Sequence, residues 1–161
     1  MNYRKKDVIV GLILIAFLLG GFYLYKTLKN PKALPTPTPS ANMTEIQGLF
    51  NYVIPEDLES IELKDVSGSN ARGLATRKFE DGLYSHTVLA DLPDPETGEF
   101  YEGWLTMDTK FISTGKLTVA KGGFLLEFSS TTDYSEYDGV VITKEKLNDG
   151  TPEMHILEGS F

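Results

Sequence analysis

The chain has 161 residues and no cysteine, and 15 Lys and Arg against 23 Asp and Glu give a formal net charge of -8. Phosphate backbones bind basic surfaces, so this charge argues against a nucleic-acid partner. The lack of cysteine excludes a disulfide framework, a thiolate metal cluster and a cysteine nucleophile. The charge is unevenly spread. Residues 1–40 hold six basic residues and one acidic residue (+5), whereas residues 41–161 hold nine basic and 22 acidic residues (-13).

An apolar run near the N-terminus predicts a transmembrane helix. Residues 8–25 read VIVGLILIAFLLGGFYLY, with no charge and no proline. At about 1.5 Å per residue this helix would span roughly 27 Å, close to the ~30 Å hydrocarbon core of a bilayer. Arg4, Lys5 and Lys6 precede it, which predicts a cytoplasmic segment at residues 1–7 and an extracytoplasmic C-terminus.

The alternative to this anchor is a cleaved signal peptide. The apolar run is longer than the usual h-region of ~7–15 residues, and no clear A-x-A box follows it. We therefore expect an uncleaved signal-anchor at residues 8–25, which holds a single-pass protein in the lipid bilayer of the cell membrane.

A proline repeat follows the apolar run. Residues 26–44 include the sequence PTPTPS at residues 35–40. Proline fixes φ and has no N–H, so such a repeat favours an extended polyproline II spacer of about 3.1 Å per residue. A PxxP ligand for an SH3-like module is the alternative, but this repeat is PxPxP and lies on the predicted outer side. The segment thus predicts a Pro/Thr-rich linker that holds residues 45–161 away from the membrane.

Residues 45–161 show the pattern of an all-β domain. Short runs of alternating or β-branched residues are separated by turn sequences such as Asp81-Gly82. The predicted strands are Ser60–Val66, Leu74–Phe79, Leu83–Asp91, Phe100–Met107, Phe111–Ile112, Leu117–Val119, Phe124–Phe128, Val140–Thr143 and His155–Phe161. No stretch has a sustained 3.6-residue period, and residues 55–60 allow one helical turn at most. The pattern predicts an antiparallel β-sandwich of about seven to eight strands, with a closed barrel as the alternative.

The residue pattern does not predict an enzyme or a cofactor. No G-x-S-x-G nucleophile elbow is present in the sequence. His86 and His155 fall in predicted strands, and either would act as a general base only if a serine and an acid converged on it. A histidine in a strand is more often a hydrogen-bonded sheet residue, so we expect no catalytic residues.

Two loops gather carboxylates of the kind that bind calcium. They are Asp91, Asp94 and Glu96 in the first loop, and Asp133, Glu136 and Asp138 in the second. Neither loop fits the D-x-[DN]-x-[DN]-G pattern with a glutamate at its twelfth position. We expect solvated acidic loops, with weak calcium binding by the second loop as the alternative. Tyr134 and Tyr137 also make the second loop a candidate for protein contact.

Five short motifs in the second half of the chain occur in a familiar order. They are FYEGWL at 100–105, STGKL at 113–117, VVITKE at 140–145, TPE at 151–153 and HILEG at 155–159. Together they resemble the extracytoplasmic C-terminal domain of anti-sigma-K factors of the RskA type. The resemblance covers about residues 70–161 and the order of anchor followed by outer domain. It implies an outer domain that senses a signal or binds a protein.

The N-terminus departs from that family. Its members carry a cytoplasmic helical domain that grips a sigma factor, and residues 1–7 are too short to form one. Anti-sigma activity would therefore require a partner subunit.

The motif residues have structural interpretations. Trp104 would anchor the core. Gly103 would permit a bulge or a close approach, and Gly115 and Gly159 would supply turn or bulge conformations. Glu145 ends the Thr-x-Glu strand of the resemblance.

The sequence therefore predicts a non-catalytic sensing or protein-interaction module on a bacterial cell surface. It predicts a membrane or envelope protein as the partner. The alternative is a surface module that binds a glycan, a peptide or calcium.

Overall fold

A computed structural model describes residues 40–161. The predicted anchor at residues 8–25 and most of the predicted linker lie outside this part of the chain. Within residues 40–161 no helix is long and apolar enough to cross a membrane. The described elements are α2 (Ala41–Phe50), β1 (Glu59–Asp65), β2 (Arg72–Glu80), β3 (Leu83–Asp91), β4 (Phe100–Met107), β5 (Lys110–Lys116), β6 (Thr118–Ala120), β7 (Gly123–Ser130), β8 (Gly139–Glu145) and β9 (Met154–Ser160).

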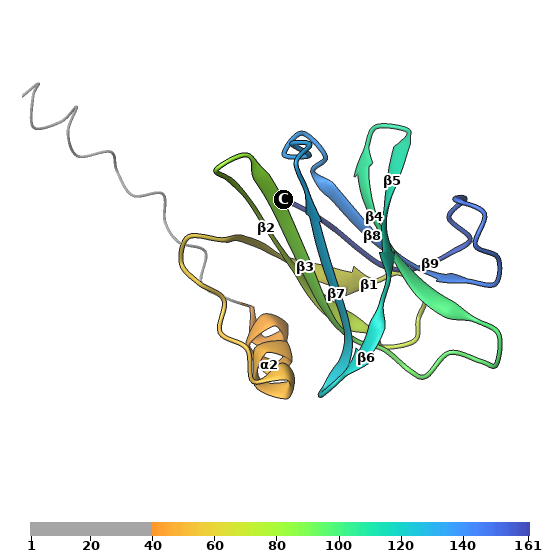
Figure 1. Cartoon of the computed structure of the whole chain (residues 1–161). Helices are drawn as coiled ribbons and strands as arrows, with labels where there is room; N and C mark the ends of the chain where they lie inside the picture. Colours follow the sequence, from red (N-terminus) through yellow and green to blue (C-terminus); the bar gives the residue numbers. More distant parts are fainter. Residues whose placement is uncertain (1–39) are drawn as a thin grey trace, which may run out of the picture. The chain divides into compact units, whose positions relative to one another are not determined.

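All nine strands belong to one antiparallel sheet, which curls into a nearly closed barrel (Figure 1). The strand order is β5-β4-β8-β9-β1-β2-β3-β7-β6. The β2–β3 hairpin has Asp81 and Gly82 at its tip, and both have positive φ. This is the backbone that the Asp-Gly sequence predicts for a tight hairpin turn.

The two ends of the sheet are joined by the chain itself. β5 and β6 stand at opposite edges of the sheet, yet Leu117 is the single residue between them. One continuous segment therefore pairs first with β4 and then with β7. Gly115 has φ +107 at this bend, and the Leu117 N–H donates to the Tyr101 carbonyl at 2.9 Å. These contacts bring the two edges together and curl the sheet.

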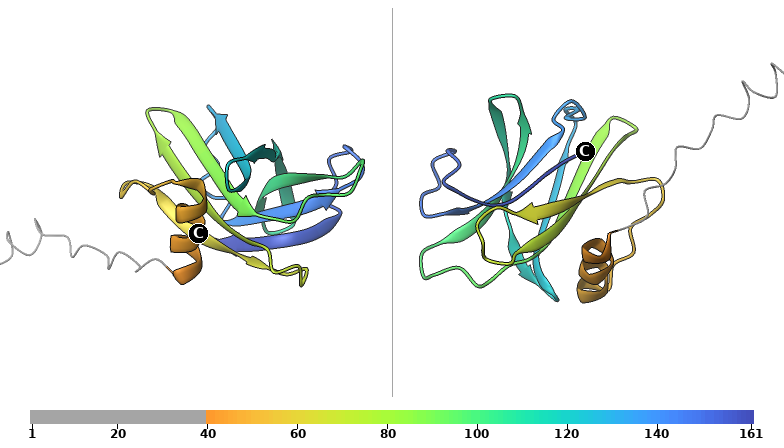
Figure 2. Two further views of the ribbon diagram at one scale, coloured as in Figure 1. Left: turned by 90° about the horizontal axis from the view of Figure 1, so that it is seen from below. Right: turned by 180° about the vertical axis from the view of Figure 1, so that it is seen from behind.

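The predicted antiparallel β-structure is confirmed except for α2, but the nine strands form one nearly closed barrel, close to the closed-barrel alternative, and not the predicted two-sheet sandwich of seven to eight strands. A sandwich needs two separate sheets that face each other. Here the bend at Gly115 carries one strand from edge to edge, so a single sheet encloses the core (Figure 2).

The main core lies inside this barrel. Alternate residues of each strand point inward, as the pleat of a strand requires. The buried residues of this cluster are Leu63, Ala71, Ala75, Tyr84, Val88, Ala90, Leu92, Tyr101, Leu105, Leu117, Phe124, Leu126, Val140, Ile142, Ile156 and Leu157. Burying such side chains stabilises a domain by roughly 1.5–3 kcal/mol each for the larger ones.

A second, smaller core lies outside the barrel, between α2 and the sheet. Ile46 of α2 packs against Leu74 on β2 and Leu89 on β3, and all three are buried. Residues 41–44, which we predicted as linker, are therefore helical. The sequence signal was weak because α2 has only 10 residues, of which only Met43 and Ile46 are buried. Its stability depends on packing against the strands, which is usual for short helices.

The N-terminus of α2 has a serine cap that gives a first prediction. The Ser40 hydroxyl accepts a hydrogen bond from the Met43 N–H at 3.2 Å. We expect Ser40→Ala to lower the free energy of unfolding by about 1 kcal/mol. Ser40→Asn, which can also cap a helix, should restore it. Urea unfolding followed by circular dichroism measures both, and equal losses in the two variants would contradict the capping role.

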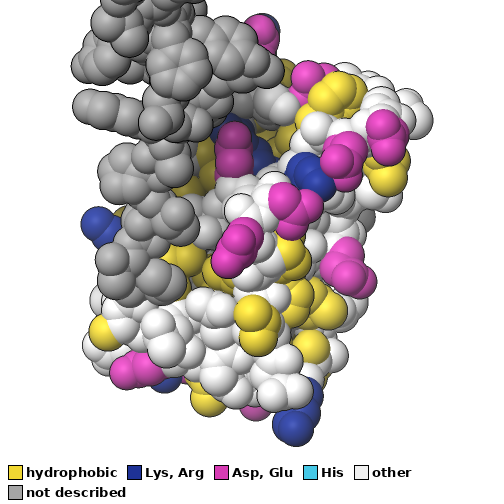
Figure 3. Space-filling model, turned by 90° about the vertical axis from the view of Figure 1, so that its left-hand side faces the viewer, with side chains coloured by type: hydrophobic (Ala, Val, Ile, Leu, Met, Phe, Trp, Pro, Cys, Tyr) yellow, Lys and Arg dark blue, Asp and Glu magenta, His cyan; other side chains and the backbone are white. Residues whose placement is uncertain are grey.

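Among the residues that the structure describes, acidic side chains outnumber basic ones on the face shown in Figure 3. This agrees with the net charge of -13 for residues 41–161. Such a charge favours solubility and repels other acidic surfaces.

Candidate functional site

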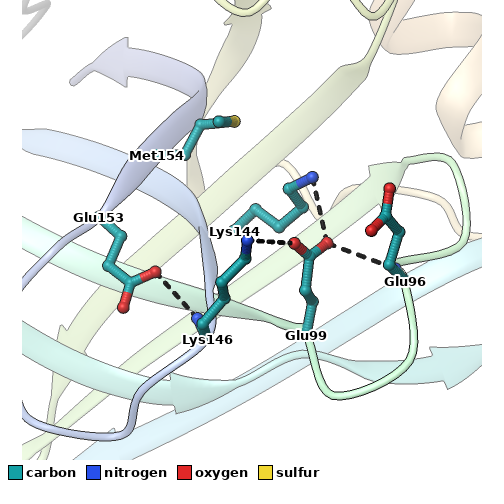
Figure 4. Close-up of a pocket in the computed structure, with 6 residues that line it drawn as sticks. All are labelled: Glu96, Glu99, Lys144, Lys146, Glu153 and Met154. Carbon is teal, nitrogen blue, oxygen red and sulfur yellow. Dashed lines mark hydrogen bonds and ion pairs between the residues drawn. The ribbon is translucent and has the colours of Figure 1, made fainter.

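An open groove of about 510 Å³ lies between the β3–β4 loop and the β8–β9 loop (Figure 4). Its lining residues are Glu96, Glu99, Lys144, Lys146, Glu153 and Met154. Three acidic and two basic side chains therefore face one another across a short distance.

Glu99 lies at the centre of the groove. Its carboxylate contacts the Nζ of Lys144 at 3.1 Å and the Nζ of Lys146 at 3.6 Å. The Glu99 side chain is only 6% exposed, so its contact with the half-buried Lys144 is shielded from water better than a usual surface pair, whereas Lys146 is exposed. The β3–β4 loop holds Glu99 in place, because its N–H donates to the Glu96 carbonyl at 2.9 Å and its carboxylate accepts from the Glu96 N–H at 3.3 Å.

This pairing fixes the charges of the groove. The hydrogen bond from Lys144 lowers the pKa of the Glu99 carboxyl, against the opposing effect of burial. The same contact raises the pKa of Lys144. Lys144 is thus held as an ammonium ion at neutral pH, which suits charge pairing and not attack as a nucleophile.

On the other side of the groove, two glutamates accept hydrogen bonds from the backbone of the β8–β9 loop. The buried Glu145 at the end of β8 accepts from the Glu153 N–H at 3.0 Å. The Glu153 carboxylate then accepts from the N–H groups of Lys146 and Leu147 at 2.9 and 3.2 Å. Two carboxylates therefore replace ladder partners for the backbone of the β8–β9 loop. This assigns a structural role to the Thr-x-Glu and Pro-Glu motifs, which the sequence alone did not reveal.

Two large apolar side chains near the β8–β9 connection are exposed to solvent. Leu147 is 62% exposed and Met154 is 54% exposed. Leu147 follows Lys146, and Met154 lines the groove itself. Exposed apolar side chains beside a charged, ordered rim are the usual composition of a protein contact surface.

The acidic loops that suggested calcium do not come together as a site. Among residues 40–161 no group of three or more His, Asp or Glu side chains is placed to hold a metal ion. Asp91 is paired with Arg72 at 3.1 Å, whereas Glu96 faces the groove. The Asp133 carboxylate accepts from the N–H and hydroxyl of Ser135 at 2.9 and 2.6 Å, which lowers its pKa.

The second acidic loop also differs from the expected contact surface. Its Glu136 and Asp138 are exposed, but Tyr134 and Tyr137 are half-buried and pack against the barrel core. Their rings stack edge to face at a centroid distance of 5.5 Å. The aromatic side chains of this loop therefore extend the barrel core and are only partly exposed to solvent.

The ring contacts of the two histidines differ from those of a serine–histidine pair. His86 is buried inside the barrel, and its Nδ1 lies 3.0 Å from the Thr76 carbonyl. His155 is on β9, and its Nδ1 lies 2.6 Å from the Glu158 carboxylate. The polar contacts of both rings are thus to a carbonyl and a glutamate, and not to a serine.

Two of the motif residues, Trp104 and Gly103, lie on opposite faces of β4. Trp104 is buried, but strand alternation puts it on the outer face of β4, opposite Tyr101 and Leu105 of the main core. Gly103 faces the interior at a bulge, where a Cβ would meet Leu126 Cδ1 at 2.7 Å. The predicted close approach at Gly103 is therefore confirmed.

The other two glycines also have structural reasons. Gly115 adopts φ +107 at the bend that closes the barrel, which favours glycine. Gly159 allows β9 to pass close to β1, because a Cβ there would lie 2.7 Å from the Glu62 carbonyl oxygen.

No protein-family model, curated protein or solved structure matches this chain. No relative therefore supports a role for the groove, which is defined by its geometry alone.

Proposed function

We propose that this chain is a membrane-anchored extracytoplasmic module that senses or binds another protein, with no catalytic activity of its own. The apolar run at residues 8–25 and the basic residues before it support the anchor and the orientation. The resemblance to the outer domain of RskA-type anti-sigma-K factors supports the sensing role. A glycan-, peptide- or calcium-binding module stays the alternative, although the acidic loops give calcium no converging ligands among residues 40–161.

The main support for the proposal is that two exposed apolar side chains lie next to charged, paired side chains at the groove. Leu147 and Met154 present apolar surface to solvent, and Glu99 with its two lysines forms a fixed polar rim beside them. A partner that buries the two apolar side chains removes them from water, and the ordered ion pairs add specificity. We place the contact with an envelope or membrane protein here.

The test is crosslinking of the full chain in intact cells that produce it, followed by recovery of its partner. We expect Leu147→Asp combined with Met154→Asp to reduce the recovered partner by about tenfold or more, because buried apolar contacts dominate such interfaces. Val53→Asp serves as the control, since Val53 is also an exposed apolar side chain, at 82%, but follows α2 and does not line the groove. It should leave the yield unchanged.

Two results would contradict the proposal. One is a partner whose yield is the same in the double variant and in the control. The other is binding confined to purified cell-wall glycan, which would favour the alternative. A recovered membrane protein that carries a sigma-binding domain would extend the resemblance to regulation.

A further inference from the structure

The barrel has a seam along which two strands lack a neighbour. Among the described strands, β5 pairs with β4 alone. β7 pairs with β6 only as far as Leu125, so residues 126–130 pair with β3 alone. Figure 1 shows β5 and β7 running apart toward the end of the domain that carries the β4–β5 turn. Alternate residues of both strands therefore direct their backbone N–H and C=O groups into the seam. These groups have no partner strand among the described residues.

The side chains that point inward beside the seam are apolar and incompletely covered. Ile112 on β5, Phe128 on β7 and Tyr134 in the following loop pack against the core but are only half-buried. A further strand beside these residues would cover their apolar surface.

The rim of the seam is acidic. Asp108 lies in the β4–β5 turn, Glu127 is exposed on β7, and Asp133 and Glu136 lie in the loop after β7. The nearest basic residue on β5 at this end is Lys110. Lys116, at the other end of β5, lies over the Phe100 ring at 3.5 Å and is directed toward β4.

We propose that the seam binds an extended, cationic segment of a partner polypeptide, which adds a strand to the free edges of β5 and β7 at the end next to the β4–β5 turn, where the two strands run apart. Backbone hydrogen bonds to both edges supply the attachment, and alternate side chains of the segment reach the apolar rings inside. The acidic rim selects basic residues on the outward face, and it disfavours a second copy of this acidic domain. This surface is separate from the groove of Glu99, so the two can be tested independently.

The probe is a synthetic peptide of about ten residues that alternates valine and lysine, added to the full chain in nanodiscs of zwitterionic lipid. Hydrogen exchange is followed by mass spectrometry in fragments that cover residues 108–117 and 124–132. We expect the amides of these fragments that lie outside the β4–β5 and β3–β7 ladders to exchange fast in the free chain and about tenfold more slowly with the peptide. A peptide of equal charge with proline at every second apolar position should not slow the exchange, because proline cannot donate to a ladder.

A pair of charge variants separates binding at the seam from general attraction to an acidic protein. Glu127→Lys on the rim should weaken peptide binding roughly threefold to fivefold. Glu56→Lys makes the same charge change at an exposed position before β1 and should leave binding within twofold. Circular dichroism confirms that both variants are folded, which both outward-facing side chains should permit.

Three results would overturn the inference. The first is slow exchange of both fragments in the free chain, which would mean that the seam closes without a partner. The second is protection that grows with protein concentration, which would assign the seam to a second copy. The third is equal weakening by both charge variants, or no protection at millimolar peptide.

Discussion

Trp104→Ala is expected to lower the free energy of unfolding by about 3–5 kcal/mol, the largest effect of any single change considered. Trp104 is the only tryptophan of the chain and is 1% exposed. Its Nε1 donates to the Thr143 hydroxyl at 2.8 Å, which ties β4 to β8 on the outer face of the barrel. The alanine variant would leave a large cavity and remove this hydrogen bond. Urea unfolding of the full chain in mild detergent, followed by far-ultraviolet circular dichroism, measures the loss.

Two variants divide the effect into its parts. Trp104→Phe keeps most of the apolar volume but loses the donor, so we expect a loss about half as large or less. Phe111→Ala removes the ring that packs edge to face against Trp104 at 6.4 Å. Phe111 is partly exposed, so its removal should cost about 1 kcal/mol. A loss below about 1 kcal/mol in Trp104→Ala would contradict the role of Trp104 as an anchor between β4 and β8.

Acidification is expected to destabilise the barrel through His86, by roughly 3 kcal/mol between pH 6.5 and pH 4. Burial lowers the pKa of His86 from 6.5 to about 4, and the nearby Arg77 guanidinium acts in the same direction. The hydrogen bond to the Thr76 carbonyl opposes the shift and does not cancel it. The folded state therefore disfavours the protonated ring.

Because the folded state favours the neutral His86 ring, the free energy of unfolding falls as the pH is lowered. Above pH 6.5 the ring is neutral in both states and the stability is fully present. As the pH falls toward 4, the unfolded chain binds a proton that the folded chain resists, so stability is lost. Below about pH 4 both states are protonated and this loss is complete.

The measurement is the free energy of unfolding of the full chain as a function of pH. His86→Gln removes the titrating ring, so its stability should change less between pH 6.5 and 4 than that of the original chain. His155→Gln is the matched control, because His155 is the other histidine of the chain and is half-exposed on β9, outside the barrel core. The control should keep the original pH dependence. Parallel curves for His86→Gln and the original chain would show that His86 does not carry the effect.

The buried end of the barrel around His86 explains why one ring has such an influence. Arg77 donates to the Tyr137 carbonyl at 3.0 Å, and its guanidinium lies 4.1 Å from the centre of the Phe161 ring. The Phe161 N–H donates in turn to the Asp138 carbonyl at 2.8 Å. The loop after β7 and the C-terminus are thus held together over His86. A charge on His86 would be confined among these groups beside a fixed guanidinium.

Much of the strand content could be predicted from local pattern. The predicted strands at 83–91 and 100–107 coincide with β3 and β4, and the Asp-Gly turn is where β2 meets β3. These predictions succeed because alternation and turn chemistry are properties of neighbouring residues. The glycine at position 103 was also interpreted correctly, since a glycine beside a large residue in a strand indicates a close approach.

Other features had no local signal. The β5–β6 segment resembles an ordinary strand broken by a glycine, and only its two sets of partners reveal that it joins opposite edges of one sheet. The groove depends on Glu99 and Lys144, which are far apart in sequence and meet because β4 pairs with β8. The acidic residues near Asp133 looked like a ligand set in sequence, but Ser135 takes the hydrogen bonds of that carboxylate.

The sequence by itself therefore determined the antiparallel β character of residues 59–161, the acidic surface and the positions of its tight turns. It also supplies the case for an anchor at residues 8–25, which rests on composition alone. The tertiary structure decided that the strands form one curled sheet, that Trp104 lies on its outer face and that Glu99 meets two lysines. The physical reason is that alternation assigns a residue to a face of its own strand. Only the register between distant strands decides which faces, edges and charges meet.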